Sequence, residues 1–166
     1  MVEVINAARA PVPAARIRAA VDAAAHVPEV SARLPANAWE LAVRISGDRE
    51  LRRLNHQFLG EDHATDVLSF PAGDAAEQSK AEAYWPVHLG DVVVSWPAVR
   101  RQAAEFGHEP EAEMLLLVVH GFLHVLGWDH ASAEEELEMT RLTVSSMAAT
   151  GARLAPGRLL AAPPPG

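Results

Sequence analysis

Cysteine is absent from the 166 residues of this chain. Its absence excludes a disulfide scaffold, an iron–sulfur cluster, a cysteine-based zinc finger and a thiol nucleophile. Any transition metal bound by this protein must therefore be held mainly by histidine, aspartate or glutamate side chains, and the chain has 8 histidines and 22 acidic residues.

An excess of basic residues is also lacking, because 14 lysines and arginines face 22 acidic residues, for a formal net charge of −8. The chain as a whole repels a nucleic-acid backbone, so contact with RNA or DNA requires a local patch. The longest apolar run, Met114–Leu126, is too short to span a membrane, and the first ten residues lack the pattern of a secretory leader. We therefore expect a cytoplasmic protein without a membrane partner.

Apolar residues make up 49% of the chain and charged residues 22%, which is typical of a globular protein. We expect a single domain over residues 1–152 and a proline-rich, disordered tail over residues 153–166. Predicted strands and helices alternate in the N-terminal part of the chain, and predicted helices dominate its C-terminal part. This order predicts an α+β fold, with α/β as the alternative, built on a single mixed sheet of about four strands packed with helices. The segments that predict the strands are Val2–Ala8, Trp39–Ile45, Val67–Phe70 and His88–Trp96.

Residues Glu109–His130 predict a central, metal-binding helix. Pro110 stands where a first helical residue belongs, and acidic residues around it lie at the positive end of the helix dipole. Residues 114–126 are apolar around the whole circumference, which indicates a helix buried on nearly every side. Gly127 is well placed as the left-handed residue that ends this helix.

Three histidines lie along this segment at the spacing of a metal site. His120 and His124 are one turn apart on the same helix face, where Cβ atoms are about 5–6 Å apart. The glycine turn then returns His130, which gives the pattern H-x3-H-x5-H. In its ligand positions this pattern is similar to the zinc motif of metzincin peptidases. Gly121 replaces the glutamate that serves those peptidases as general base, so peptide hydrolysis by that route is not expected.

Three neutral imidazoles favour zinc, although nickel, cobalt and copper also suit such ligands. We expect one Zn²⁺ per chain, held by His120, His124 and His130. Three protein ligands leave a fourth position open, which is typical of catalytic rather than structural zinc sites. Asp129 is either a hydrogen-bond partner of one imidazole or a solvated turn residue.

The segment HGFLHVLGWDH, residues 120–130, closely resembles the signature of the YbeY family of rRNA-maturation endoribonucleases. Two further blocks fit the family in order and spacing: Leu54–Pro71, which ends in TDVLSFP at Thr65–Pro71, and LGDVVVS at Leu89–Ser95. The chain departs from the signature at Val125 and Trp128, both mild changes among apolar or aromatic residues. The resemblance covers nearly all of the chain except the tail.

This resemblance implies a zinc-dependent endoribonuclease that cleaves single-stranded RNA in 16S rRNA 3′-end maturation and ribosome quality control. It implies that His120, His124 and His130 are the metal ligands and that a metal-activated water performs the hydrolysis. The implied partners are ribosomal RNA, the small ribosomal subunit and ribosomal proteins. An alternative from a different functional class is a metal-stabilised ribosome-assembly factor with little catalysis of its own.

Three residues are candidates for binding the substrate. The family usually carries an arginine just before the position of Gly60, but this chain has Leu59 there, which cannot donate hydrogen bonds to phosphate. Arg52 and Arg53 lie nearby in the sequence and are candidates to replace that arginine. Thr65 is a candidate for the wall of the site by resemblance alone. No side chain is assigned as general base.

Overall fold

The computed structural model describes residues 1–61, 65–73 and 86–158, which form one mixed sheet covered by helices. Strands β1, β2 and β4 run parallel, and the edge strand β3 runs antiparallel to β4. The predicted α+β fold with a single mixed sheet of about four strands is therefore confirmed. In spatial order the strands are β1 (Val2–Asn6), β2 (Trp39–Ser46), β4 (Val87–Ser95) and β3 (Val67–Pro71).

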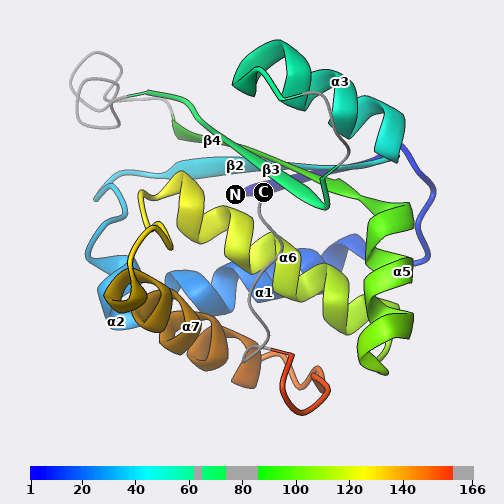
Figure 1. Cartoon of the computed structure of the whole chain (residues 1–166). Coiled ribbons are helices and arrows are strands. Elements are labelled where there is room, and N and C mark those ends of the chain that lie inside the picture. The colour runs from blue at the N-terminus through cyan, green and yellow to red at the C-terminus, as the bar shows by residue number, and fades with distance from the viewer. Residues whose placement is uncertain (62–64, 74–85, 159–166) are drawn as a thin grey trace.

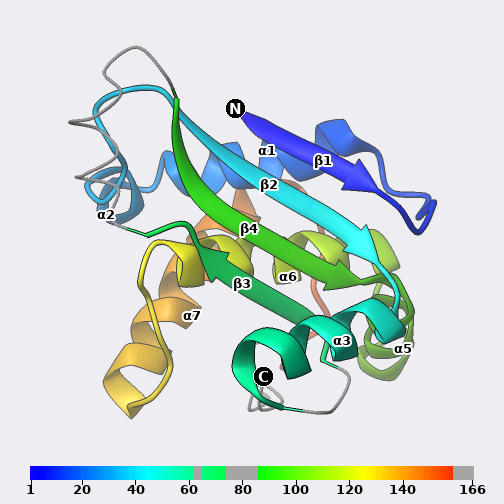
Figure 2. The same cartoon turned by 90° about the horizontal axis from the view of Figure 1, so that it is seen from above.

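Helices lie on both faces of this sheet (Figure 1). α1 and α6 cover one face, and α7 packs against both of them on the side away from the sheet. α3 lies on the opposite face beside β3 and β4, as the view from above shows (Figure 2). None of the described helices has both the length and the apolar character needed to span a bilayer. The helices are α1 (Ala14–Ala25), α2 (Pro28–Ser31), α3 (Asp48–Leu59), α5 (Trp96–Phe106), α6 (Pro110–Val125) and α7 (Ala133–Ala148).

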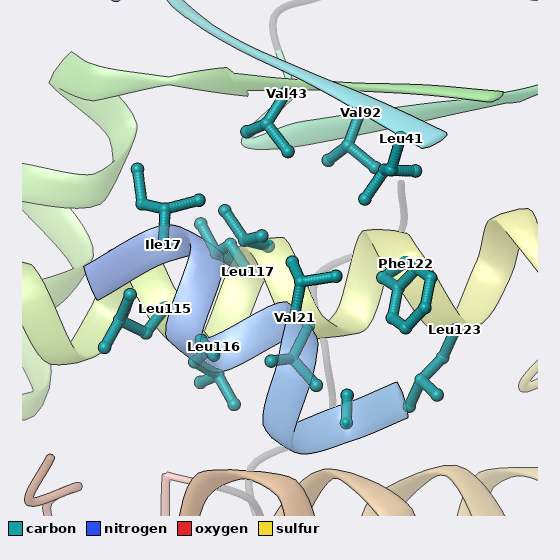
Figure 3. Close-up of a cluster of buried hydrophobic side chains, with 14 of the residues drawn as sticks. Ile17, Val21, Leu41, Val43, Val92, Leu115, Leu116, Leu117, Phe122 and Leu123 are labelled. Carbon is teal, nitrogen blue, oxygen red and sulfur yellow. The ribbon is translucent and has the colours of Figure 1, made fainter. Parts of the chain in front are cut away.

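The larger core lies between the sheet and helices α1, α6 and α7. Leu41, Val43 and Val92 point from the sheet toward Ile17 and Val21 of α1 and toward the apolar side chains of α6 (Figure 3). The two β2 residues share this face because alternate side chains of a strand point to the same side. Each fully buried side chain of this kind contributes roughly 1.5–3 kcal/mol, so this layer is the main source of stability.

A smaller core lies under α3 on the opposite face of the sheet. Leu51 of this helix packs against Leu68 of β3 and Val93 of β4. The other α3 side chains are mostly polar and exposed, and the helix ends at Gly60, whose φ of 72° lies in the left-handed region. The helix is therefore anchored by a narrow apolar stripe and presents a largely polar surface to solvent, with Phe58 and Leu59 exposed at its C-terminal end.

A buried ion pair joins the C-terminal residues to the first turn of α6. The Glu113 side chain is 0% exposed, and its carboxylate accepts hydrogen bonds from Nε of Arg158 at 2.9 Å and from Nη2 at 2.6 Å. Nδ1 of His108 accepts the backbone N–H of Ala155, so the ring hydrogen is on Nε2. This Nε2 donates to the same carboxylate at 2.7 Å. A carboxylate at this depth is tolerated because it is paired and hydrogen-bonded.

Residues 153–158, which belong to the predicted tail, make further contacts with the rest of the described chain. Leu154 packs on the large core, and the buried Arg158 lies over the ring of Phe106. The prediction used only the composition of these residues, which does not reveal partners in distant parts of the chain. Residues 159–166, the remainder of the predicted tail, lie outside the described residues.

Helix α6 approaches the sheet closely at Gly121. A Cβ atom at this position would lie 2.6 Å from Cγ1 of Val92 and 3.2 Å from Oγ of Ser69. The Ser69 hydroxyl donates a hydrogen bond to the carbonyl oxygen of Gly121 at 3.1 Å. Glycine therefore lets the helix and the sheet meet at a distance that a larger residue would increase.

We expect Gly121→Ala to lower the free energy of unfolding by about 1–3 kcal/mol, because the added methyl group overpacks the contact with Val92. Urea unfolding of the variant and the wild type measures this difference. Val92→Ala removes the obstructing methyl groups, so the double variant should lose less stability than the two single variants combined. Strict additivity of the two losses would contradict this account.

An ion pair between α3 and α5 makes the stability depend on pH. Asp48 of α3 accepts hydrogen bonds from Arg101 at 2.9 Å and from Ser95 at 2.7 Å. The hydrogen bond from Arg101 lowers the pKa of the Asp48 carboxyl below its usual value. A carboxyl with a lowered pKa in the folded state stabilises the fold above its unfolded pKa, about 3.9, and this contribution is lost as the pH falls through the folded pKa.

Asp48→Asn is therefore expected to cost about 0.5–1 kcal/mol at pH 7, a modest value because the pair is partly exposed. At a pH below the folded pKa of Asp48 the two proteins should be nearly equal in stability, since the wild-type carboxyl is then protonated. Urea unfolding at both pH values measures the change. Arg101→Gln removes the other partner and should reduce the pH dependence in the same way. A stability difference that is the same at both pH values would rule out this role for Asp48.

Candidate metal centre

Three histidines converge at the C-terminal end of α6. His120 and His124 lie one turn apart on this helix, and their Nε2 atoms are 3.0 Å apart. The ring centroid of His130, which follows the helix, is 5.8 Å from that of His120 and 5.1 Å from that of His124. The structure thus brings together the three residues that the sequence pattern selected.

The turn that returns His130 depends on Gly127. Its φ of 100° lies in the left-handed region, which favours glycine. The Gly127 N–H donates to the carbonyl oxygen of His124 at 3.0 Å, and the Trp128 N–H donates to that of Leu123 at 3.1 Å. These two bonds form a Schellman motif, so Gly127 ends the helix as predicted.

Asp129 belongs to the same cluster. His124, Asp129 and His130 each offer a ligand atom within 4.8 Å of the others. Oδ1 of Asp129 also accepts the backbone N–H of His130 at 2.7 Å, a bond that shapes the turn before the third histidine. Asp129 is exposed, in agreement with the alternative of a solvated turn residue. Its bond to the backbone is a contact that the spacing of the ligands does not indicate.

Burial keeps two of these histidines uncharged at neutral pH. It lowers the pKa of His120 to about 3, with further lowering from the nearby charges of His124 and His130. Burial also lowers the pKa of His124, and the charge of His130 acts in the same direction. Neutral imidazoles offer the lone pairs that a metal ion requires, so binding displaces no proton from these two rings at pH 7.

The cluster fits a bound cation. Among the described residues Nδ1 of His130 is buried without a hydrogen-bond partner, and the Asp129 oxygen 3.5 Å away is already bonded to backbone. Buried polar atoms normally have a partner, so this nitrogen is one that an ion would satisfy. Two imidazole nitrogens on one tetrahedral zinc lie about 3.3 Å apart, close to the 3.0 Å between His120 and His124.

Gly121 leaves no acidic side chain next to His120. A side chain at position 121 would enter the interface with Val92 and Ser69 of the sheet. A glutamate there would therefore force helix and sheet apart. The prediction that this position supplies no general base now has a steric reason, which the sequence pattern alone did not contain.

The described residues do not gather the candidate substrate-binding side chains at the histidines. Arg52 and Arg53 are exposed on α3, which lies on the opposite face of the sheet from α6 (Figure 1). Thr65 is only 9% exposed, and its hydroxyl lies 3.5 Å from the carboxylate of Asp66, which in turn accepts a hydrogen bond from Gln102 of α5. A substrate strand that touches both α3 and the histidines must therefore pass around the edge strand β3.

Two similar proteins carry the name of the family whose model matches this chain. The family model described as Endoribonuclease YbeY matches residues 4–151 of this chain. A relative from Chloroflexus aggregans, named Endoribonuclease YbeY, is 42% identical over 125 residues, which cover 74% of this chain and 81% of the relative. A relative of the same name from Gloeobacter violaceus is 53% identical over 95 residues, 57% of this chain, and the match spans about half (48%) of that relative's length.

A solved structure is similar in fold. The solution structure of TM1509 from Thermotoga maritima has a TM-score of 0.58 and 24% sequence identity, and the match covers 90% of this chain and 89% of that chain. At this identity the likeness supports the fold alone. The match of the family model over most of the chain shows that this protein belongs to the Endoribonuclease YbeY family, which confirms the predicted resemblance and an enzyme class that hydrolyses RNA.

Proposed function

We propose that this chain is a zinc-dependent endoribonuclease that hydrolyses phosphodiester bonds in single-stranded RNA. In this proposal His120, His124 and His130 hold one Zn²⁺. The observation that supports it is the convergence of the three imidazoles at the end of a buried helix, in a chain whose family is named for RNA cleavage. We also propose that the family-matched residues and the segment packed on them, as far as Arg158, form one domain.

Individual residues of this chain would contribute to such a site in different ways. Zinc, when bound, supplies Lewis acidity and makes water a nucleophile near neutral pH. His120 and His124 are held uncharged by burial and face each other through Nε2. Asp129 fixes the backbone of His130. Gly121 offers no side chain that could accept the proton of the attacking water. We therefore propose that solvent or a substrate oxygen accepts this proton.

The charge of the chain bears on how RNA arrives. With a net charge of −8, the protein gains little from counterion release on a free RNA backbone. We therefore propose that ribosomal RNA reaches the site as part of the small ribosomal subunit, in the cytoplasm, and that ribosomal proteins are partners. The proposed processes are 16S rRNA 3′-end maturation and ribosome quality control. Arg52 and Arg53 on the exposed face of α3 are the proposed phosphate contacts.

A second candidate function is a metal-stabilised ribosome-assembly factor with little catalysis. Two observations favour it. Leu59 is 55% exposed at the end of α3, where the family usually has an arginine, and Gly121 contributes no general base. In this alternative the metal fixes the end of α6 and the following turn, and the protein binds RNA without cleaving it.

Purified wild-type protein is expected to contain about one zinc ion per chain, and His124→Ala much less. Loss of groups that merely support ligands already costs about 10–100-fold in affinity, and loss of a ligand costs more. Elemental analysis after gel filtration measures the content. His26→Ala, which removes an exposed histidine at the end of α1, is the matched control and should keep the metal. Equal zinc in all three proteins would exclude the histidine site.

Zinc-loaded wild-type protein is expected to cleave a single-stranded RNA oligonucleotide, and His124→Ala should be at least about 100-fold slower, because the ion would no longer be held. Denaturing gels of end-labelled RNA measure the rates. His26→Ala should cleave at the wild-type rate, and a chelator should stop cleavage until zinc is restored. Zinc-loaded wild-type protein that binds the RNA without cutting it would favour the assembly-factor function instead.

A further inference from the structure

The segment Leu126–Ser132 carries Asp129 and His130 between α6 and α7. Its backbone is attached to α6 through the bonds of the Schellman motif, which end at Trp128. From residue 129 to residue 131 no backbone–backbone hydrogen bond joins it to another described element. At the other end Ser132 caps α7 through its side chain and its carbonyl oxygen. The position of His130, midway between these two anchors, therefore depends on how firmly Trp128 and Ser132 are held.

Trp128 is fixed on its edge and on one face. Its side chain belongs to the large core, and the residue is 5% exposed. The indole Nε1–H donates to Oε1 of Glu138 on α7 at 3.3 Å. The guanidinium carbon of Arg33 lies 3.6 Å from the ring centroid, within the range of a cation–π contact. The exposed Arg33 thus covers the indole face and separates it from solvent.

Arg33 also binds the end of the metal-bearing helix. Its Nη1 donates to the carbonyl oxygen of Leu126 at 3.3 Å, one of the terminal carbonyl groups that a helix leaves unpaired. Arg33 follows the short helix α2, where its N–H donates to the carbonyl oxygen of Val30 at 3.0 Å. A planar guanidinium can stack on a ring and donate in its own plane at once, which the ammonium group of a lysine cannot do.

We infer that Arg33 is a positioning residue for the metal centre, acting through Trp128 on His130. The inference rests on the proposed function, because it assumes that His130 is a ligand. Arg33 contacts the Trp128 ring and the carbonyl oxygen of Leu126, so it holds the turn on which the third ligand depends. Groups that orient metal ligands in this way typically contribute about 10–100-fold to metal affinity.

The test is the zinc affinity of the full chain, measured by competition with a chromophoric chelator. Arg33→Ala is expected to bind zinc about tenfold more weakly than the wild type. Arg33→Lys keeps the charge but loses the planar stack, so its affinity should also fall. Arg141→Ala is the matched control, because Arg141 is another exposed arginine near α2, paired with Glu29, and should keep the wild-type affinity.

Thermal unfolding of the metal-free proteins separates positioning from stability. Loss of Arg33 should lower the midpoint by only a few degrees, and zinc affinity is measured at a temperature where every variant is folded. A lowered midpoint with wild-type zinc affinity would overturn the inference and leave Arg33 a purely structural residue. Wild-type affinity no higher than that of His124→Ala would instead reject the metal centre itself, and the inference with it.

Discussion

The burial of helix α6 is the constraint on which the rest of the structure depends. This helix packs against β3, β4, α1, α5 and α7, so almost every side is covered. Gly121 lets it approach the sheet closely, and two imidazoles near its end are consequently held in a medium that disfavours their charged forms. The burial of α6 thus determines both the position and the protonation state of His120 and His124.

The fold could be predicted where the determining residues are close in sequence. Pro110 begins α6, Gly127 ends it, and alternation in residues 39–45 predicts β2, because each pattern reflects local backbone geometry. The four-residue helix α2 escaped prediction because it is too short to show periodicity. The contacts of the C-terminal segment could not be predicted because the side-chain partners of Arg158 lie 45 or more residues away, which composition does not reveal.

In the candidate site, too, contacts between residues close in sequence could be predicted and contacts between distant residues could not. His120, His124 and His130 could be grouped from spacing, since one helix turn and one glycine turn determine where they lie. The stack of Arg33 on Trp128 joins residues 95 positions apart, and no pattern in the sequence connects them. Arg53 shows a different limit: it is near the family's arginine position in sequence, yet its helix lies across the sheet from the histidines. Proximity along the chain does not show which face of a sheet a helix covers.

The pair between Glu113 and Arg158 has a consequence for where this protein ends as a folded unit. The family match stops at residue 151, yet the cation that neutralises a fully buried carboxylate of α6 comes seven residues later. A chain trimmed to the matched residues would leave Glu113 with no arginine beside it, a defect that typically costs about 3–5 kcal/mol. The boundary suggested by similarity and the boundary required by electrostatics are therefore different.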